Sequence, residues 1–154
     1  MTAIVAVCEN GGIGKDGALL FHIREDLRRF RQLTLGKTVV MGRKTLESLH
    51  GGRGLPDRRN LVLTRDRNFS AAGAEVIHDP AEAPEDAVVI GGESVYRQLL
   101  PQWDTVYVTK IFASPQADAF FPDLSRDSGW TEAERSEMYT SGGVRFQYVT
   151  YRRR

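Results

Sequence analysis

Hydrophobic residues in this chain fall into short runs rich in valine and isoleucine, separated by polar and glycine-containing segments. Short runs of this composition are typical of β-strands. The pattern predicts strands over residues 3–8, 38–41, 60–64, 75–78, 87–90, 105–111 and 143–151. Several of these runs are apolar on both faces, so we expect them in the middle of a sheet that helices cover on each side.

Helical periodicity lies between the first two strands. Residues 25–35 place Leu27, Phe30 and Leu33 on one stripe and most of the neighbouring arginines outside it. This spacing predicts an amphipathic helix whose apolar stripe packs on the sheet.

Two further helices are predicted, one from Arg43 to the glycine pair at 51–52 and one over residues 93–100, which Pro101 ends. Strands and helices thus alternate over the first two thirds of the chain, as in α/β folds with a parallel sheet. The last two predicted strands have no helix between them and are expected to pair antiparallel. We therefore predict one α/β domain over residues 1–154, with a mixed, mostly parallel sheet and flanking helices.

Composition and charge narrow the functional classes. The 154 residues include 21 basic and 20 acidic side chains, a net charge of +1, so no one-sided field would attract nucleic acid. The longest apolar run has six residues, at 3–8, against about 20 for a membrane-spanning helix, so no membrane partner is expected. A single cysteine, Cys8, forms no internal disulfide and has no metal-ligand cluster around it. We therefore expect a cytoplasmic monomer without a bound metal.

A candidate anion site lies at Gly91-Gly92, between the predicted strand at 87–90 and the helix that follows. Glycines allow a ligand to approach the backbone closely, and the first turn of a helix presents unpaired N–H groups at its positive dipole end. These features suit a phosphate group. The alternative interpretation is an ordinary tight turn, which the negative charge of Glu93 favours.

Gly42 occupies the same position between a strand and a helix, and Arg43, Lys44 and Thr45 follow it. Cations in the first turn of a helix are unfavourable by up to about 1 kcal/mol unless an anion binds there. Arg65, just after the next predicted strand, would join this cluster if the two strands are neighbours. Arginine suits phosphate because its planar fork donates two parallel hydrogen bonds. Two such sites suggest a dinucleotide with two separated phosphate groups.

The early glycines at 11–14 do not have the spacing of the usual dinucleotide fingerprint, and no helix follows them. Residues 9–24 instead predict a long loop with glycine hinges, which contains the apolar run at 18–21. Long ordered loops of this kind are often lids over a site, and a surface excursion is an equal alternative.

Asp26 lies in the first turn of the predicted helix at 25–35, beside its apolar stripe. One role for it is stabilisation of the helix dipole, but Glu25 already supplies that charge. A carboxylate beside apolar surface needs a polar partner. A heterocycle with two adjacent N–H donors would satisfy both of its oxygens, so Asp26 is a candidate for ligand binding.

The sequence gives no support to hydrolytic chemistry. His22, His50 and His78 do not form a catalytic set, no serine lies in a nucleophile-elbow motif, and no carboxylate pair suggests glycoside hydrolysis. Trp103 and Trp130 are expected in the core or on sheet faces.

From end to end the chain resembles the dihydrofolate reductases. The motifs that carry the resemblance are Ile13-Gly14, Asp26-Leu27 with Phe30, residues 40–45, Leu55-Pro56 with Arg58-Arg59-Asn60, Ile90-Gly91-Gly92 with Tyr96, residues 107–109, and Asp118 before Phe121-Pro122. Each motif is modest, but their order and spacing over nearly the whole chain are specific. The resemblance implies an eight-stranded mixed sheet, with NADPH across the strand ends and dihydrofolate in a neighbouring cleft.

The resemblance also implies a set of NADPH-binding residues. Gly91, Gly92, Ser94 and Val95 would cradle the pyrophosphate, and Arg43 and Arg65 would favour the 2′-phosphate of NADPH over NADH. The full set is Ala6, Ile13, Gly14, Leu19, Gly42, Arg43, Lys44, Thr45, Thr64, Arg65, Ile90, Gly91, Gly92, Glu93, Ser94, Val95 and Tyr96.

The implied reaction is hydride transfer to C6 of the pterin with protonation of N5. Asp26 would accept the pterin 2-amino group and N3, and Arg58 would clamp the α-carboxylate of the glutamate tail. The implied substrate-binding set is Ile4, Val5, Asp26, Leu27, Phe30, Leu49, Leu55, Arg58, Ile90 and Thr109. The implied catalytic set is Asp26, Leu19, Phe21 and Thr109. Because Asp26 is not expected to reach N5, a water would deliver the proton.

Three features depart from the family pattern. Leu20-Phe21 stands where the family has Pro-Trp, which removes an indole N–H that would hold a water near the carboxylate. His22 is a candidate to compensate for this loss. Arg24 replaces a common proline, and the glycine-rich segment at 51–54 is slightly enlarged. Two alternatives therefore stay open: a related reductase of a ribosylated pyrimidine intermediate, and a catalytically silent nucleotide-binding module.

Overall fold

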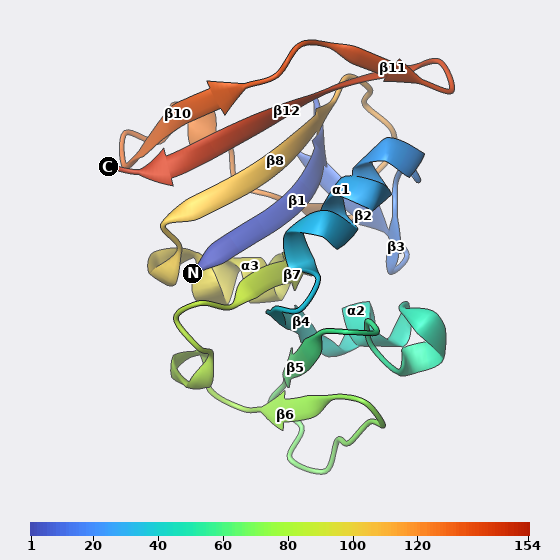
Figure 1. Ribbon diagram of the computed structural model, residues 1–154, viewed down its shortest axis with the longest axis vertical. Coiled ribbons are helices and arrows are strands. Elements are labelled where there is room, and N and C mark those ends of the chain that lie inside the picture. Colours follow the sequence, from blue (N-terminus) through green and yellow to red (C-terminus); the bar gives the residue numbers. More distant parts are fainter.

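The computed structural model describes the backbone of residues 1–154 and every side chain except that of His50. One large sheet runs through the molecule, with strand order β10-β12-β8-β1-β7-β4-β5-β6 and with β11 paired to β12 (Figure 1). Its strands are β1 (Thr2–Cys8), β4 (Thr38–Gly42), β5 (Arg59–Leu63), β6 (Glu75–Ile77), β7 (Val88–Gly91), β8 (Thr105–Ile111), β10 (Trp130–Arg135), β11 (Tyr139–Ser141) and β12 (Val144–Arg153).

The sheet is mixed and mostly parallel, which confirms the predicted α/β class. Strands β8, β1, β7, β4, β5 and β6 pair in parallel, whereas β12 pairs antiparallel with β8, β10 and β11. The sheet has nine strands instead of the expected eight, because β11 adds a short hairpin to β12. The pattern of apolar runs missed β10 because its residues after the buried Trp130 are all exposed.

Three α-helices connect the strands: α1 (Arg24–Thr34), α2 (Arg43–Glu47) and α3 (Glu93–Leu99). The second helix is shorter than predicted, because Leu49 has an extended backbone and a 3₁₀ turn, His50–Gly52, replaces the last part. The third ends at Leu99, one residue before its predicted end, and leads into another 3₁₀ turn that contains Pro101.

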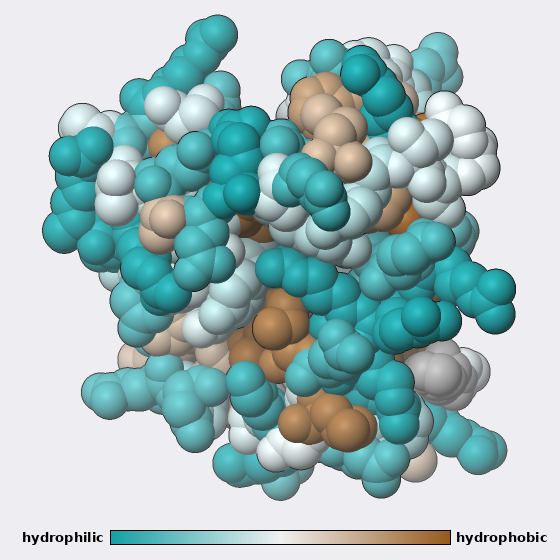
Figure 2. All heavy atoms as spheres, turned by 45° about the horizontal axis from the view of Figure 1, so that its top comes forward, coloured by the Kyte–Doolittle hydropathy of each residue, from teal (hydrophilic) through white to brown (hydrophobic). Residues whose placement is uncertain are grey.

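Successive residues of the strands point to opposite faces of the sheet, and each face has its own core. Val40 packs with Val95 and Leu99 on the side of α3, whereas Val39 and Met41 pack on the opposite side, which α1 and α2 cover. In Figure 1, α1 lies in front of the sheet and the fainter α3 lies behind it. On the surface, apolar residues reach solvent in small patches framed by hydrophilic side chains (Figure 2).

Residues 9–24, predicted as an irregular loop, form part of a second, small sheet. Its strands are β2 (Gly12–Lys15), β3 (Ala18–Leu19) and β9 (Ala119–Phe120), in the order β3-β2-β9. These strands are too short to give a sequence pattern, and β9 lies about a hundred residues further along the chain. No helix among the described residues is long and apolar enough to cross a membrane.

Tyr96 connects α3 to β1 and packs in the core on the α3 side of the sheet. Its hydroxyl donates a hydrogen bond of 2.6 Å to the carbonyl oxygen of Ile4, and its ring meets Trp103 and Phe121 edge-on at 5.9 and 5.0 Å. Only 4% of Tyr96 is exposed, and burial raises the pKa of its hydroxyl well above the ordinary value.

We expect Tyr96→Phe to lower the free energy of unfolding by about 1–3 kcal/mol, because the partly buried carbonyl of Ile4 would lose this hydrogen bond. Thermal and urea unfolding measure this loss. Tyr139→Phe is the matched control, since Tyr139 is 38% exposed and should tolerate the change. Equal stability of the Tyr96 variant and the native protein would contradict the role of this bond.

Candidate active site

Asp26 lies in the first turn of α1 and faces the central sheet. Its carboxylate accepts a hydrogen bond of 2.5 Å from the hydroxyl of Thr109 on β8. The neighbouring Val108 packs in the core on the other face, so the alternation of β8 turns Thr109 toward α1. The structure thus pairs Asp26 with Thr109, two residues that the resemblance placed in the same site.

Two influences of opposite sign act on the Asp26 carboxyl group. Burial raises its pKa above the ordinary value, and this is the largest effect. The hydrogen bond from Thr109 and the positive charge of Arg29 lower the pKa. A half-buried carboxylate with a single protein hydrogen bond has capacity for further donors, which suits a bound heterocycle.

The two glycine turns meet at one edge of the sheet. Strands β4 and β7 are parallel neighbours, so their carboxyl ends lie side by side. A Cβ atom on Gly42 would lie 3.8 Å from the backbone nitrogen of Gly92 and 3.1 Å from Val95, and one on Gly92 would lie 3.6 Å from the hydroxyl of Thr45. The turns at Gly42 and Gly91-Gly92 thus lie together and form one cradle.

The cradle has the properties that a pyrophosphate group requires. Gly42 and Gly92 are the N-caps of α2 and α3, and neither helix has a side chain that caps its first N–H groups. The peptide between Gly91 and Gly92 is cis. The backbone donors at these helix ends are therefore available to an anion, and the absence of Cβ atoms leaves room for it.

Glu93 does not direct its charge into the cradle. Its carboxylate accepts a hydrogen bond of 2.5 Å from the backbone N–H of Phe120 on β9 and lies 3.1 Å from the guanidinium of Arg97. This pairing removes the main argument for an ordinary turn at Gly91-Gly92.

Tyr96, another residue of the predicted NADPH set, lies beneath the turn. A Cβ atom added to Gly91 would lie 3.5 Å from its ring.

The cationic residues predicted near the adenosine end are brought together. Strand β5 is the neighbour of β4, with Leu63 opposite Gly42, so Thr64 and Arg65 follow directly beside Arg43. The guanidinium of Arg43 pairs with Asp66 at 3.0 Å, and with Glu47 at 3.2 Å. It also stacks over Phe69 at 4.6 Å. Arg65 and Lys44 are exposed.

Hydrogen bonds around β2 and β9 hold the small sheet together. The carboxylate of Asp118 accepts the backbone N–H of Asp16 at 3.0 Å, and its own N–H donates to the carbonyl of Gly14 at 3.0 Å. Asp118 belongs to one of the motifs that carry the resemblance, but the sequence indicated no role for it. In the turn of this hairpin Asp16 and Gly17 have φ angles of 53° and 78°, a conformation that favours an Asp-Gly pair.

The predicted lid residues differ in their surroundings. Phe21 packs in a third cluster with Ala6 and Ile23, and Ile13 packs against the core on the side of α3. Leu19 is 50% exposed. His22 is also exposed, and among the described residues its ring makes no hydrogen bond to Asp26, so the structure does not support compensation by His22.

The predicted walls of the cleft fall into three groups. Ile4, Phe30, Leu49, Leu55 and Ile90 gather in one apolar cluster on the side of α1 and α2. Val5 does not join them, because the alternation of β1 points its side chain into the core on the other face. Leu27 is 43% exposed and is not part of the packed wall.

Arg58 is held by groups that the sequence did not indicate. Its Nε donates to the carbonyl of Pro56 at 2.9 Å, and its Nη1 donates to the hydroxyl of Thr34 at 3.0 Å. Burial, and then the charge of Arg31, lower the pKa of Arg58. Arg58 also lines a cavity of about 500 Å³, whose other lining residues are Arg53, Gly54, Leu55, Pro56, Asp57, Asn60 and Gly73.

We expect Asp26→Asn to raise the free energy of unfolding at neutral pH. Because the pKa of Asp26 is raised by folding, the native carboxyl loses stability as the pH rises through that pKa, whereas an amide does not ionise. Thermal unfolding at several pH values should show a gain near neutrality that vanishes in acid. Glu25→Gln is the control of opposite sign, because folding lowers the pKa of Glu25 and that substitution should give no gain at neutral pH. A gain independent of pH would contradict the explanation.

Comparison with known proteins agrees with this geometry. The family model for dihydrofolate reductase matches residues 1–153. The dihydrofolate reductase of Neisseria gonorrhoeae is 42% identical over 158 residues, covering 98% of this chain and 96% of the relative. The type 3 dihydrofolate reductase of Salmonella typhimurium is 44% identical over 142 residues, covering 88% and 86%.

A solved structure is similar over the same length. Dihydrofolate reductase from Enterococcus faecalis, complexed with NADP(H) and RAB-propyl, superimposes with a TM-score of 0.87 at 35% identity. The match covers 99% of this chain and 95% of that chain. The chain described here, with its acidic residue on α1 and its glycine cradle between β4 and β7, belongs to the dihydrofolate reductase family.

Proposed function

We propose that this protein reduces 7,8-dihydrofolate to 5,6,7,8-tetrahydrofolate with NADPH, and that Asp26 is the residue on which substrate binding depends. The observation that carries the proposal is the half-buried Asp26 carboxylate, held by Thr109 on the sheet face that α1 covers. Membership of the dihydrofolate reductase family supports the same reaction and the same cofactor.

The chain contributes a binding surface for NADPH at the carboxyl ends of β4 and β7. Gly42, Gly91 and Gly92 admit the pyrophosphate to the backbone, and Thr45 and Ser94 lie in the first turns of the two helices. Bound NADPH supplies the hydride for C6 of the pterin. Further members of the proposed cofactor surface are Ala6, Ile13, Gly14, Leu19, Lys44, Thr64, Ile90 and Val95.

Asp26 binds and orients the pterin. Its two oxygens accept the 2-amino group and N3, while Thr109 fixes the carboxylate in place. This arrangement stabilises positive charge on the ring as N5 becomes protonated, with the proton delivered by water. Leu19 of β3 and Phe21, which follows the small sheet, exclude bulk solvent from the reacting atoms.

Arg58 binds the carboxylate at the other end of the substrate. Two of its nitrogen atoms are fixed by Pro56 and Thr34, so the guanidinium is held in one orientation before the ligand arrives. Such preorganisation lowers the entropy cost of binding. A single domain over residues 1–154, a monomeric state and a cytoplasmic location stay predictions.

We expect the purified protein to oxidise NADPH in the presence of dihydrofolate, and Asp26→Asn to lower turnover at neutral pH by roughly 10²-fold or more. The absorbance of NADPH measures the rate. Tight NADPH binding without turnover would indicate a silent nucleotide-binding module, and turnover only with a ribosylated pyrimidine intermediate would indicate the related reductase. A native rate in the Asp26 variant would remove this residue from the mechanism.

We expect Arg43→Ala combined with Arg65→Ala to weaken NADPH binding by about tenfold or more and to leave NADH binding nearly unchanged. The reason is that only NADPH carries the 2′-phosphate, with which the two guanidinium groups would form charge-assisted hydrogen bonds. Isothermal titration with each nucleotide measures the difference. Arg67→Ala is the control, because Arg67 is an exposed arginine of the same segment. Equal losses for the two nucleotides would refute the assignment.

A further inference from the structure

Arg29 occupies an unusual position for an arginine on a helix. It follows Asp26 by three residues, a spacing that places both side chains on the same face of α1. Its guanidinium carbon lies 4.1 Å from the ring centre of Tyr148 on β12 and 5.7 Å from that of Tyr107 on β8. The nearby Arg28 is exposed, whereas Arg29 is half-buried between the helix and the sheet.

The two tyrosines flank the residue that holds Asp26. In the antiparallel pairing of β8 with β12, Tyr148 lies opposite Thr109, and Tyr107 lies two residues before Thr109 on the same face. A guanidinium stacked on both rings is therefore held beside the Thr109–Asp26 hydrogen bond. Cation–π contacts of this kind restrict the guanidinium without using its charge in an ion pair.

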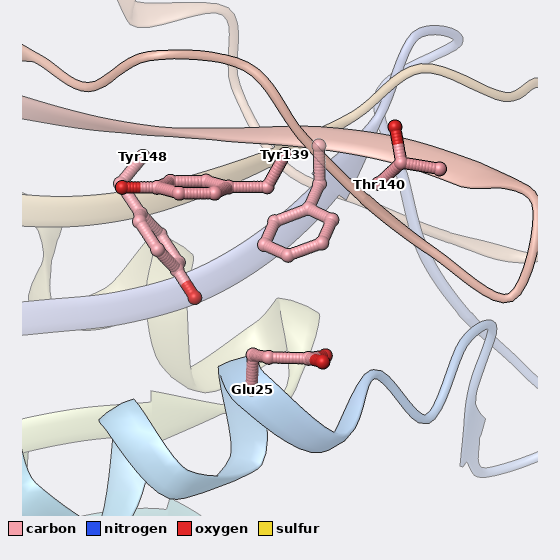
Figure 3. Close-up of a pocket in the computed structure, with 5 residues that line it drawn as sticks. Glu25, Tyr139, Thr140 and Tyr148 are labelled. Carbon is pink, nitrogen blue, oxygen red and sulfur yellow. The ribbon is translucent and has the colours of Figure 1, made fainter.

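Tyr148 is itself supported by neighbouring rings. Tyr139 and Phe146 lie 5.8 and 5.7 Å from it, ring centre to ring centre. Together with Thr140 and Glu25 these three aromatic residues line a cavity of about 330 Å³ (Figure 3). Figure 3 shows the rings of Tyr139 and Tyr148 between the hairpin of β11 and β12 and the start of α1, where Glu25 lies. The support restricts the tyrosine on which Arg29 stacks.

The charges around Asp26 explain what Arg29 does there. The groups around this part of the site are Arg29 and Glu25 from α1, the hydroxyl of Thr109 and the ring of Tyr107 from β8, and Tyr148 from β12. Among the described side chains, none forms an ion pair with Asp26 within 4.0 Å. The positive charge of Arg29 favours the ionised carboxyl, against the penalty of burial. Because it does not touch the carboxylate oxygens, they stay available to a ligand.

We propose that Arg29, fixed by its stacking on Tyr148 and Tyr107, is a positioning residue that keeps the buried Asp26 carboxylate ionised and yet unpaired, ready for the donors of the substrate. This proposal rests on the proposed function in one respect only, namely the identity of the ligand that Asp26 binds. The electrostatic relation between Arg29 and Asp26 is a property of the free protein. It is therefore measurable without substrate.

The test is a titration of the Asp26 carboxyl by carbon-13 NMR in the full-length, substrate-free protein. Arg29→Gln should move the midpoint of that titration to higher pH, because the favourable charge is removed while burial remains. Arg28→Gln is the matched control, since it removes the same charge from an exposed site two residues from Asp26 and should leave the midpoint in place. An unchanged midpoint in Arg29→Gln, or an equal movement in both variants, would overturn the proposal.

Two substitutions of Tyr148 test the stacking and cover the case in which Arg29→Gln does not fold. Tyr148→Phe keeps the ring and should retain the native midpoint, whereas Tyr148→Leu releases the guanidinium and should move the midpoint in the same direction as Arg29→Gln. Native behaviour of the leucine variant would show that stacking is not what places the charge.

Kinetics with NADPH and dihydrofolate separate this proposal from the function. In Arg29→Gln the midpoint of the pH profile of kcat/KM should move to higher pH. In a protein that already carries Asp26→Asn, the same substitution should produce no such movement. If the native protein shows no turnover but the NMR midpoint still moves, the reaction is wrong and the role of Arg29 stands. If turnover is present but neither midpoint moves, only the role of Arg29 is lost.

Discussion

The hydrogen bond between Thr109 and Asp26 connects the main parts of this molecule. Asp26 belongs to α1, which is longer than α2 and α3, and Thr109 lies on β8 in the middle of the sheet, 83 residues away in sequence. A carboxylate in this half-buried position is costly unless polar groups satisfy it. The fold provides one partner, the hydroxyl of Thr109, and the carboxylate can accept further hydrogen bonds from a ligand. The proposed binding of the substrate depends on this incomplete satisfaction.

The cofactor surface follows from a different constraint, which is the direction of the parallel strands. Because β4 and β7 are neighbours and both lead into helices, the backbone N–H groups at the starts of α2 and α3 converge at one edge. Glycine at positions 42, 91 and 92 keeps this edge open. The carboxylate of Glu93 accepts a hydrogen bond from the backbone of β9. This bond connects the start of α3 to the small sheet.

Stability and function oppose each other at Asp26. Burial disfavours the ionised carboxyl, as the direction of its pKa shows, and an apolar or neutral group would fold at lower cost. The positions of Arg29 and Thr109 reduce this cost without occupying both oxygens. The same principle governs Arg58, whose contacts with Thr34 and Pro56 hold it in place while its charge stays available.

Local patterns in the sequence determined the amphipathic helix α1 and every strand of the central sheet except β10 and β11, since apolar periodicity is a property of a few adjacent residues. They also marked the glycine turns and Asp26, because a charge or a glycine pair in an apolar context is visible without a structure. Tertiary structure alone decided that the two turns form a single cradle, that β2 pairs with the distant β9, that Val5 faces away from the cleft, and that Arg29 rather than Arg28 stacks beside Asp26. Each of these depends on which strands are neighbours and on which face a side chain lies. Contacts between residues far apart in sequence fix both properties, and no local pattern records them.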